Sequence, residues 1–412
     1  MTGSPTNGSS SDNSTKVNLL DLSAAAISSA IVAADQITAL AGSANENNTS
    51  SGENKNARLK IDGSFVTDAD MAAQQIIVDA LYNKVSSEIR IVGEENEEEM
   101  RKRAITGHET RLESIFQLAR KEISIWYHGN STDNNSQEPL PLAQQQSKTE
   151  AQPQELDSDI KIDKMQEYEI ETNRVTVWID PLDATNSYAN GDYGPVSILV
   201  AIVVDQTPCF GVICKPFGYP GQPSVLDTGC MVVYGGTLLG AAYIAGSGRI
   251  QSRSSKQKHD FDLVTDLPRA VISKSRSKGI QDFVNYLAEK GIVHPEPLLV
   301  SGAGEKSLRI ITRFENEGLW FFPSGGTSLW DVAASDALLR AIGGKLTDKF
   351  GNAMDYSKSR KEAANVKGVV ACYDQDMHAE CIRLYLEGSW FPNSKYTKKD
   401  LLKSNYGDKP FS

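Results

Sequence analysis

The feature that most constrains this chain is the stretch of residues 174–185, RVTVWIDPLDAT. Residues 174–179 are rich in β-branched and aromatic side chains and predict a buried strand. Asp180 and Asp183 follow, with Pro181 between them and a hydroxyl at Thr185. A strand end bent by proline can turn both carboxylates to one point, where they repel unless a cation lies between them. The stretch predicts an Mg²⁺ site, since Mg²⁺ takes oxygen ligands; the alternative is an exposed Asp-Pro turn.

The overall composition narrows the class of protein. At 412 residues the chain exceeds one ordinary domain, so we expect two lobes or one large α/β unit. The net charge of −11 argues against nucleic acid or an anionic membrane as a partner. The five cysteines form no C-x-x-C pair, which indicates reduced thiols and makes zinc an unfavoured reading.

The order of segments predicts two lobes with a solvated insertion. We expect a disordered N-terminus at 1–16, a metal-binding α+β lobe at 17–205, a C-terminal α/β lobe at 206–395 that completes the site, and a tail at 396–412. Within the first lobe, residues 97–172 are polar and predict an insertion outside the core.

The apolar segment 19–40 predicts an amphipathic helix packed on the body, with a targeting segment as the disfavoured alternative. No stretch is expected to span a bilayer, so the prediction is a cytoplasmic protein.

Strands and helices are predicted to alternate without a repeat. We expect helices near 70–85, 280–290 and 330–342, and strands near 89–92, 270–273 and 319–322. Residues 196–204 and 207–215 predict a hairpin, and Gly343-Gly344 predicts a left-handed cap after the third helix. The fold class is therefore a layered α/β protein with mixed sheets.

Four further segments place acids or small residues beside predicted element ends. They are residues 60–70 (KIDGSFVTDAD), 93–95 (GEE), 330–331 (WD) and 302–306 (GAGEK). Each has an ordinary structural reading: a helix N-cap at Thr67 or Asp68, a solvated acidic turn, an acid that stabilises a helix dipole, and a solvated lysine.

Taken together, the octet WIDPLDAT, the GEE segment, and the WD motif followed by a helix and Gly-Gly resemble the lithium-sensitive, Mg²⁺-dependent phosphomonoesterases of the inositol monophosphatase superfamily. The resemblance covers roughly residues 18–390. It implies a layered α-β-α-β-α sandwich and hydrolysis of a phosphate monoester.

The resemblance also implies a site. Two or three Mg²⁺ ions would be held by the acids of the motifs and by the backbone carbonyl of Leu182; the implied ligands are Glu94, Asp180, Leu182, Asp183, Asp331 and Asp70. Thr185, with an acid of the Glu94 region, resembles the hydroxyl that orients the attacking water, so Thr185, Glu94 and Asp70 are the implied catalytic residues. Asp62 is similar in position to another family acid.

A helix beginning at Ala184-Thr185 would direct backbone N–H groups at the phosphate. Metals would neutralise the phosphate and lower the pKa of a bound water. The five clustered carboxylates would repel each other without them.

Two segments bear on the substrate. Residues 271–277 (VISKSRS) and 302–308 (GAGEKSL) resemble stretches of the bisphosphate nucleotidase and inositol polyphosphate 1-phosphatase branches. Lys274 and Lys306 are therefore expected to meet a second phosphate. The implied substrate-binding residues are Ala184, Thr185, Ser273, Lys274, Ser275, Lys306 and Asp331.

The first prediction is removal of the 3′-phosphate from adenosine 3′,5′-bisphosphate. Inositol polyphosphate 1-phosphatase or inositol monophosphatase activity is the alternative. A protein of another class, a phosphate-ligand sensor that has lost turnover, is disfavoured because no acid of the set is missing, nor is Thr185. The expected partner is a small phosphate ester; the oligomeric state is not predicted.

Overall fold

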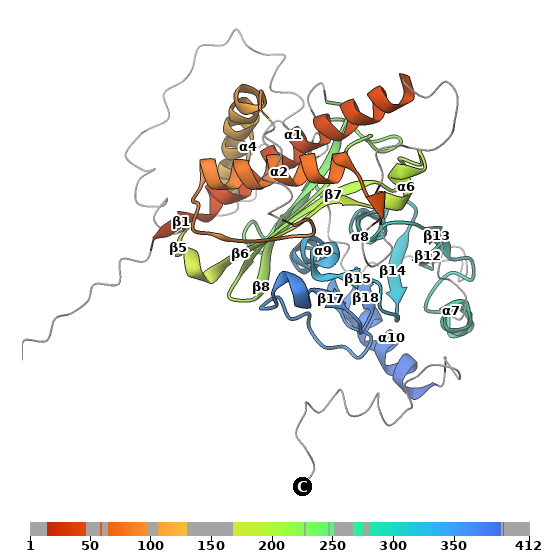
Figure 1. The fold of residues 1–412 in the computed structure, drawn as a ribbon. Coiled ribbons are helices and arrows are strands. Elements are labelled where there is room, and N and C mark those ends of the chain that lie inside the picture. Colours follow the sequence, from red (N-terminus) through yellow and green to blue (C-terminus); the bar gives the residue numbers. More distant parts are fainter. Residues whose placement is uncertain are drawn as a thin grey trace, which may run out of the picture.

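A computed structural model describes residues 15–46, 58–59, 65–96, 106–129, 168–225, 228–245, 248–250, 267–274, 280–388 and 390. These residues build five layers: helices, a seven-stranded sheet, helices, a five-stranded sheet and helices (Figure 1). The predicted fold class, a layered α-β-α-β-α sandwich with mixed sheets, is confirmed.

The larger sheet has the strand order β11-β10-β9-β8-β7-β6-β4. β4 and β6 are parallel, and each other neighbouring pair is antiparallel. The strands are β4 (Arg90–Gly93), β6 (Val175–Asp183), β7 (Ser197–Val204), β8 (Thr207–Lys215), β9 (Met231–Gly236), β10 (Ala241–Ile244) and β11 (Gly248–Arg249). Along β6, Val177 and Ile179 enter one buried cluster and Trp178 the other, as period-2 alternation requires in a sheet covered on both faces.

The smaller sheet has the order β13-β12-β14-β18-β16. Its strands are β12 (Arg269–Ser273), β13 (Leu298–Val300), β14 (Glu317–Phe322), β16 (Lys345–Thr347) and β18 (Val369–Cys372). β13, β12 and β14 are parallel, while β18 is antiparallel to β14 and β16. Short pairs form elsewhere: β1 (Lys16–Asn18) with β5 (Glu169–Glu171), β2 (Arg58–Leu59) with β3 (Phe65–Val66), and β15 (Thr327–Ser328) with β17 (Ala364–Asn365).

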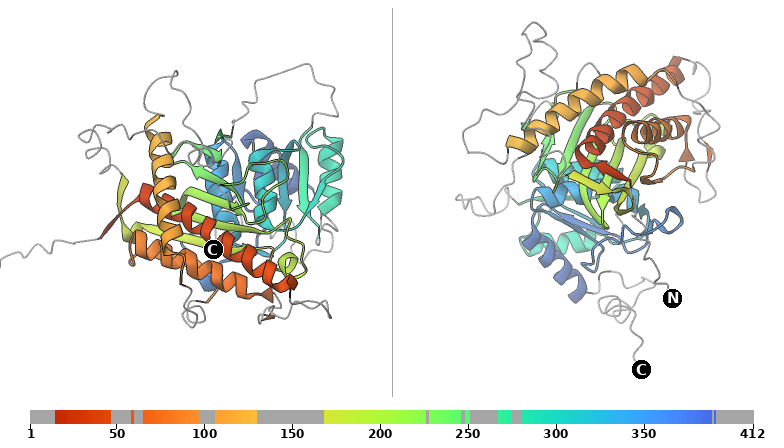
Figure 2. Two further views of the ribbon diagram at one scale, coloured as in Figure 1. Left: turned by 90° about the horizontal axis from the view of Figure 1, so that it is seen from above. Right: turned by 90° about the vertical axis from the view of Figure 1, so that its left-hand side faces the viewer.

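Helices fill the three remaining layers. α1 (Leu19–Glu46), α2 (Asp68–Lys84) and α4 (Glu109–Gly129) lie on the outer face of the larger sheet. α8 (Ala303–Thr312) and α9 (Leu329–Ala341) lie between the sheets, and α7 (Ile280–Glu289) and α10 (Gln375–Glu387) cover the far face of the smaller one. The short elements are α6 (Thr185–Ala189), η3 (Thr172–Arg174) and η4 (Arg360–Glu362). Figure 2 shows α1, α2 and α4 together on one side of the molecule.

The predicted strands, hairpin and helices agree with these elements. α9 ends as expected: Gly343 has φ +85° and the Gly344 N–H donates to Leu339 O at 2.8 Å. α8, over the GAGEK segment, is a helix that was not predicted from the sequence.

The predicted solvated insertion at 97–172 is wrong where the structure describes it. α4 packs on α1 through an apolar stripe with Ile115, Phe116, Ala119 and Ile123, all buried. Arg111 reinforces the contact by pairing with Asp35. The stripe repeats every three or four residues, which the surrounding charges obscured. Residues 97–105 and 130–167 lie outside the described residues, as do residues 1–14 of the N-terminus predicted to be disordered over 1–16 and the predicted tail at 396–412. Within that N-terminus, Lys16 already begins β1.

The predicted lobe boundary at residue 205 is also wrong. It falls in the turn between β7 and β8, which are neighbouring strands, and their sheet continues to β11. The two predicted lobes therefore share one sheet.

α1 has the length and composition of a membrane span over Leu19–Gly42, with a mean hydropathy of 1.5. The expectation that no stretch is long and apolar enough is therefore wrong on those two criteria. Of this window, 72% is buried inside the protein, against α2, α4 and the larger sheet. The predicted role as a helix packed on the body is confirmed.

Candidate active site

The site begins where β6 leaves the larger sheet. Pairing with β7 shifts register between Asp180 and Asp183, which gives the chain its bend at Pro181. The Leu182 N–H donates to Asp180 Oδ1 at 3.1 Å, so the first carboxylate closes the turn. Asp180 is 2% exposed and Asp183 is 9% exposed. The octet is thus a buried strand end rather than an exposed Asp-Pro turn.

Glu94 follows the parallel neighbour β4. Its N–H donates to Ile179 O at 3.1 Å, which extends the β4–β6 pairing, and Glu94 and Asp180 directly follow the paired residues Gly93 and Ile179. The next residue, Glu95, exchanges two hydrogen bonds with the Gln74 side chain. Gly93 allows this approach, because a Cβ there would lie 2.5 Å from Gln74 Cδ. The segment is therefore held from α2 as well as from β6.

Asp331 enters the site from α9. It is the third residue of the helix and closes a capping box with Ser328, whose N–H donates to Asp331 Oδ2 at 2.7 Å. The structural reading of Asp331 as an acid of the first turn is thus correct, and the same carboxylate also lines the pocket.

The buried acids of the site repel one another, and this repulsion changes the pKa of Asp180 and Asp331. Burial raises the pKa of Asp180 well above its usual range, and the charges of Glu94, Asp331 and Asp183 raise it further. Burial, together with Asp183 and Glu94, raises the pKa of Asp331 to about 8. The two carboxyl groups therefore disfavour each other's charged form, as closely placed carboxyls do when no cation separates them.

This donor set fits a hard cation. Buried carboxylate oxygens that repel one another, with a turn carbonyl beside them, are ligands that Mg²⁺ prefers. In the part of the chain that the structure describes, no three His, Cys, Asp or Glu side chains already surround one metal-sized point. The acids would therefore have to move closer together to bind one ion.

Asp183 is held by the start of α8. Its Oδ1 accepts from Ala303 N at 3.1 Å, and its Oδ2 accepts from Gly304 N at 2.7 Å and from Ser197 Oγ at 3.1 Å. A Cβ at residue 304 would lie 2.1 Å from Ser197 Oγ, so glycine is required there. The GAGEK segment is therefore the N-terminus of a helix against Asp183.

A hydrogen bond between Thr185 and Asp70 joins α6 to α2 at the site. Thr185 Oγ1 lies 3.0 Å from Asp70 Oδ1 and 2.9 Å from Leu182 O. The other oxygen of Asp70 accepts from Thr67, from N at 2.7 Å and from Oγ1 at 2.5 Å. Burial raises the pKa of Asp70 to about 7, and the charges of Glu95 and Glu94 reinforce the shift against the hydrogen bonds from Thr67. Thr67 is thus the predicted N-cap, and Asp70 serves both the cap and the site.

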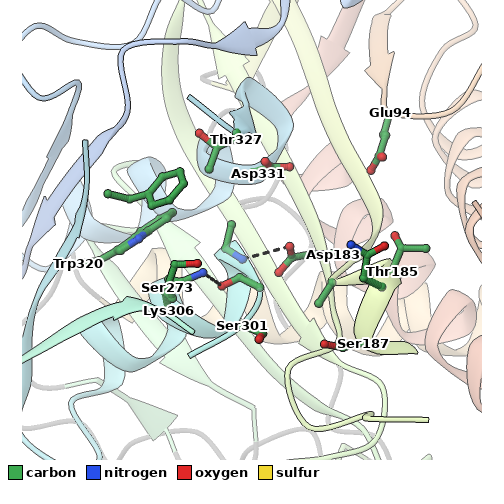
Figure 3. A pocket seen from close by; sticks show the side chains of 16 residues that line it. Glu94, Asp183, Thr185, Ser187, Ser273, Ser301, Lys306, Trp320, Thr327 and Asp331 are labelled. Atoms are coloured by element: carbon green, nitrogen blue, oxygen red, sulfur yellow. Dashed lines mark hydrogen bonds between the residues drawn. The ribbon is translucent and has the colours of Figure 1, made fainter. Parts of the chain in front are cut away.

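A pocket of about 340 Å³ joins these groups. Figure 3 shows Glu94, Asp183 and Thr185 on one side and Ser273, Lys306 and Trp320 on the other. The Lys306 Nζ donates to Gly302 O at 2.7 Å and lies 5.7 Å from the centre of the Trp320 ring. The pocket therefore has an acidic side and a side with one cation, hydroxyls and aromatic rings.

Most of the predicted site residues lie together here. Asp331, Glu94, Asp183, Ala184, Thr185, Ser273 and Lys306 line the pocket, with Asp180, Leu182 and Asp70 directly behind it. Ala184 precedes α6 with φ +68°, a left-handed conformation that glycine adopts without strain and that costs energy for a residue with a Cβ. The helix begins at Thr185, as expected.

The predicted substrate contact of Lys274 has no counterpart in the pocket lining. Lys274 is exposed, outside the set that lines the pocket, and its N–H pairs with Val300 O at the sheet edge. The hydroxyl of Thr185 hydrogen-bonds Asp70 of α2, and its role with an acid of the Glu94 region in orienting the water stays a prediction. Ser275 and Asp62 lie outside the described residues.

Sequence reasoning missed several residues that shape the site: Thr67, Ser197, Ser301, Trp320, Phe322 and Thr327. A T-x-x-D capping signal at 67–70 marked the first of them. The others come from strands and loops whose sequence carries no local signal for a pocket.

Solved structures share this fold. The suhB protein of Bartonella henselae aligns with a TM-score of 0.50 at 14% identity, over 88% of this chain and 98% of its own. An inositol monophosphatase from Anabaena aligns with a TM-score of 0.50 at 13% identity, over 91% and 98%. The layers and the acidic strand end therefore define an inositol-monophosphatase-like fold.

Sequence similarity identifies the family of the chain. The model of the inositol monophosphatase family matches residues 132–385, and the chain belongs to that family. It is 29% identical to mouse 3′(2′),5′-bisphosphate nucleotidase 1 over 204 residues, and 29% identical to zebrafish (Danio rerio) inositol monophosphatase 3 over 223 residues. These alignments cover 49% and 53% of this chain, and 58% and 56% of the two relatives' lengths.

Proposed function

We propose that this protein is a Mg²⁺-dependent phosphomonoesterase. The observation that carries the proposal is the convergence of acids from three separate segments, Glu94 after β4, Asp180 and Asp183 at the end of β6, and Asp331 in α9. The family is generally metal-dependent, and the relatives named above are phosphomonoesterases.

Glu94, Asp180, Asp183, Asp331 and the carbonyl of Leu182 would hold two or three Mg²⁺ ions, with Asp70 supporting a further ion and its waters. Bound metal would neutralise the phosphate and activate a water. The hydroxyl of Thr185 has one proton and two acceptors within reach, Asp70 and Leu182 O. When it donates to Asp70, its lone pairs orient the water. Through this hydrogen bond Thr185 can pass a proton of the water to the carboxylate of Asp70.

The proposed substrate is adenosine 3′,5′-bisphosphate, which would lose its 3′-phosphate. The acidic side of the pocket would bind the phosphate that is cleaved, and Lys306 with Ser273 would meet the second one. The position of Lys306 in the pocket wall supports a doubly phosphorylated substrate, since an otherwise acidic site repels a second anion.

A second candidate is inositol polyphosphate 1-phosphatase activity. The GAGEKSL segment supports this activity as much as the first one, because its sequence resembles both branches. It supplies the helix start at Asp183 and the pocket residue Lys306. A catalytically inactive phosphate sensor is disfavoured by the complete set of acids and Thr185.

Phosphate release from three substrates separates these candidates. Adenosine 3′,5′-bisphosphate, inositol 1,4-bisphosphate and inositol 1-phosphate are each assayed with and without Mg²⁺. Fastest Mg²⁺-dependent release from the nucleotide supports the first proposal, and fastest release from the inositol bisphosphate supports the second. No Mg²⁺-dependent release from any of them contradicts both and leaves the sensor.

A further inference from the structure

Two arginines link the segment 357–360 to β4. One lies on β4 and donates to the segment, and the other lies on the segment and donates to the end of β4. Arg90, at the start of β4, donates to Ser357 O at 3.4 Å and to Lys358 O at 2.5 Å. Arg360 donates from Nε to Gly93 O at 3.2 Å and to Glu94 O at 3.0 Å, and from Nη2 to Glu94 O. The second arginine therefore contacts the backbone of a proposed metal ligand, and the first contacts none.

The same segment continues to the start of α9. Ser359 and Glu362 form a capping box that holds η4, and Ala363 O accepts from Leu329 N at 2.9 Å. β17 then pairs with β15, which directly precedes α9. Leu329 is the first residue of the helix that carries Asp331. Residues 359–365 thus connect the backbone of Glu94 to the backbone that positions Asp331.

This connection joins the two segments that carry Glu94 and Asp331. Glu94 and Asp331 both line the pocket, so their carboxylates repel each other when no cation lies between them. Glu94 is held by β6 through its N–H and by Arg360 through its carbonyl. Arginine suits this role because its planar guanidinium presents several donors in fixed directions, which a lysine ammonium does not.

We propose that Arg360 is a positioning residue that fixes Glu94 relative to Asp331, so that both carboxylates keep the positions that the proposed metal centre requires. The inference rests on the proposed function, because it takes these acids as metal ligands. Arg360 is exposed, so its replacement should leave the fold intact.

The test is Mg²⁺ binding to the metal-free full chain by isothermal titration calorimetry. Arg360→Gln is expected to bind Mg²⁺ about tenfold more weakly, the lower end of the effect of losing a group that orients a metal ligand. Arg90→Gln is the matched control, since it removes the reciprocal contact between the same two segments and is expected to keep wild-type affinity. Arg360→Lys should retain part of the affinity, because one ammonium still reaches one carbonyl.

Wild-type affinity in Arg360→Gln would overturn the inference, as would an equal loss in Arg90→Gln. If Arg360→Gln does not fold, Arg360→Lys decides, and wild-type affinity there is the contradicting result. Asp180→Asn, titrated in parallel, separates the two proposals. If Asp180→Asn binds Mg²⁺ as the wild type does, the metal site itself is wrong. If only Asp180→Asn loses binding, the metal site stands and the role of Arg360 fails.

Discussion

The hydroxyl of Thr185 lies 3.0 Å from Asp70 Oδ1, although the two residues are 115 positions apart in the sequence. Thr185 begins α6 directly after the acidic strand end, and Asp70 belongs to the first turn of α2. The contact joins the helix layer to the end of β6, and it places a proton acceptor beside the acids that we propose to bind metal.

Replacing Thr185 with Val should therefore reduce turnover without removing a metal ligand. We expect kcat to fall at least about 100-fold, the lower range for loss of a group that takes part in proton transfer. Mg²⁺ affinity, measured by calorimetry, should stay near that of the wild type. Thr185→Ser keeps the hydroxyl and is the matched control. Val and Ser variants with equal kcat would show that the hydroxyl has no catalytic part.

Lys306 and Lys274 provide a paired test of substrate recognition. Lys306 lines the pocket, whereas Lys274 is exposed outside it. Lys306→Met should raise KM for adenosine 3′,5′-bisphosphate about tenfold or more, because a charge-assisted contact is worth about 1.5 kcal/mol or more. The same variant should affect a monophosphate substrate less, and Lys274→Met should affect neither. Equal losses on both substrates would remove Lys306 from the second-phosphate role.

His378 gives a prediction for stability against pH. Burial and the nearby Lys345 lower the pKa of His378 to about 4, and its Nε2 lies 2.8 Å from Thr347 Oγ1. The unfolded chain, where the pKa is 6.5, binds a proton that the folded protein does not, so stability falls as pH drops from about 6.5 toward 4. Between pH 7.5 and pH 5 this amounts to about 2 kcal/mol.

Urea denaturation of the wild type and of His378→Gln at these two pH values measures the effect. The pH-dependent loss of unfolding free energy should be smaller in the variant by about 2 kcal/mol. An identical loss in both proteins would show that His378 does not titrate as described.

Local patterns predicted much of the fold because they are set by neighbours in the sequence. The β-branched run before Asp180, the hairpin at 196–215 and the glycines after α9 each depend on a few adjacent residues, and each is confirmed. α4 was missed because its apolar stripe is embedded in charged residues that the packing against α1 leaves on the outside.

Contacts between distant segments could not be predicted in this way. Asp70 carries the local signal of a capping box, which gives no indication that its second oxygen meets Thr185. No helix was predicted for the GAGEK segment, in which two glycines disfavour one, but their lack of side chains is what lets α8 approach Asp183 and Ser197. Only the folded chain brings these pairs together.

Phosphate release by Asp180→Asn tests the central claim most directly. Asp180 is more buried than Glu94, Asp183 and Asp331, and all three raise its pKa. The substitution keeps the size of the side chain and removes a carboxyl group whose charged form these neighbours disfavour, so the variant should fold and be no less stable to heat without metal. With adenosine 3′,5′-bisphosphate and Mg²⁺, we predict that it releases phosphate at least about 1,000-fold more slowly than the wild type, as expected if metal-mediated charge stabilisation is lost. Turnover close to that of the wild type would contradict the assignment of these acids as a metal site.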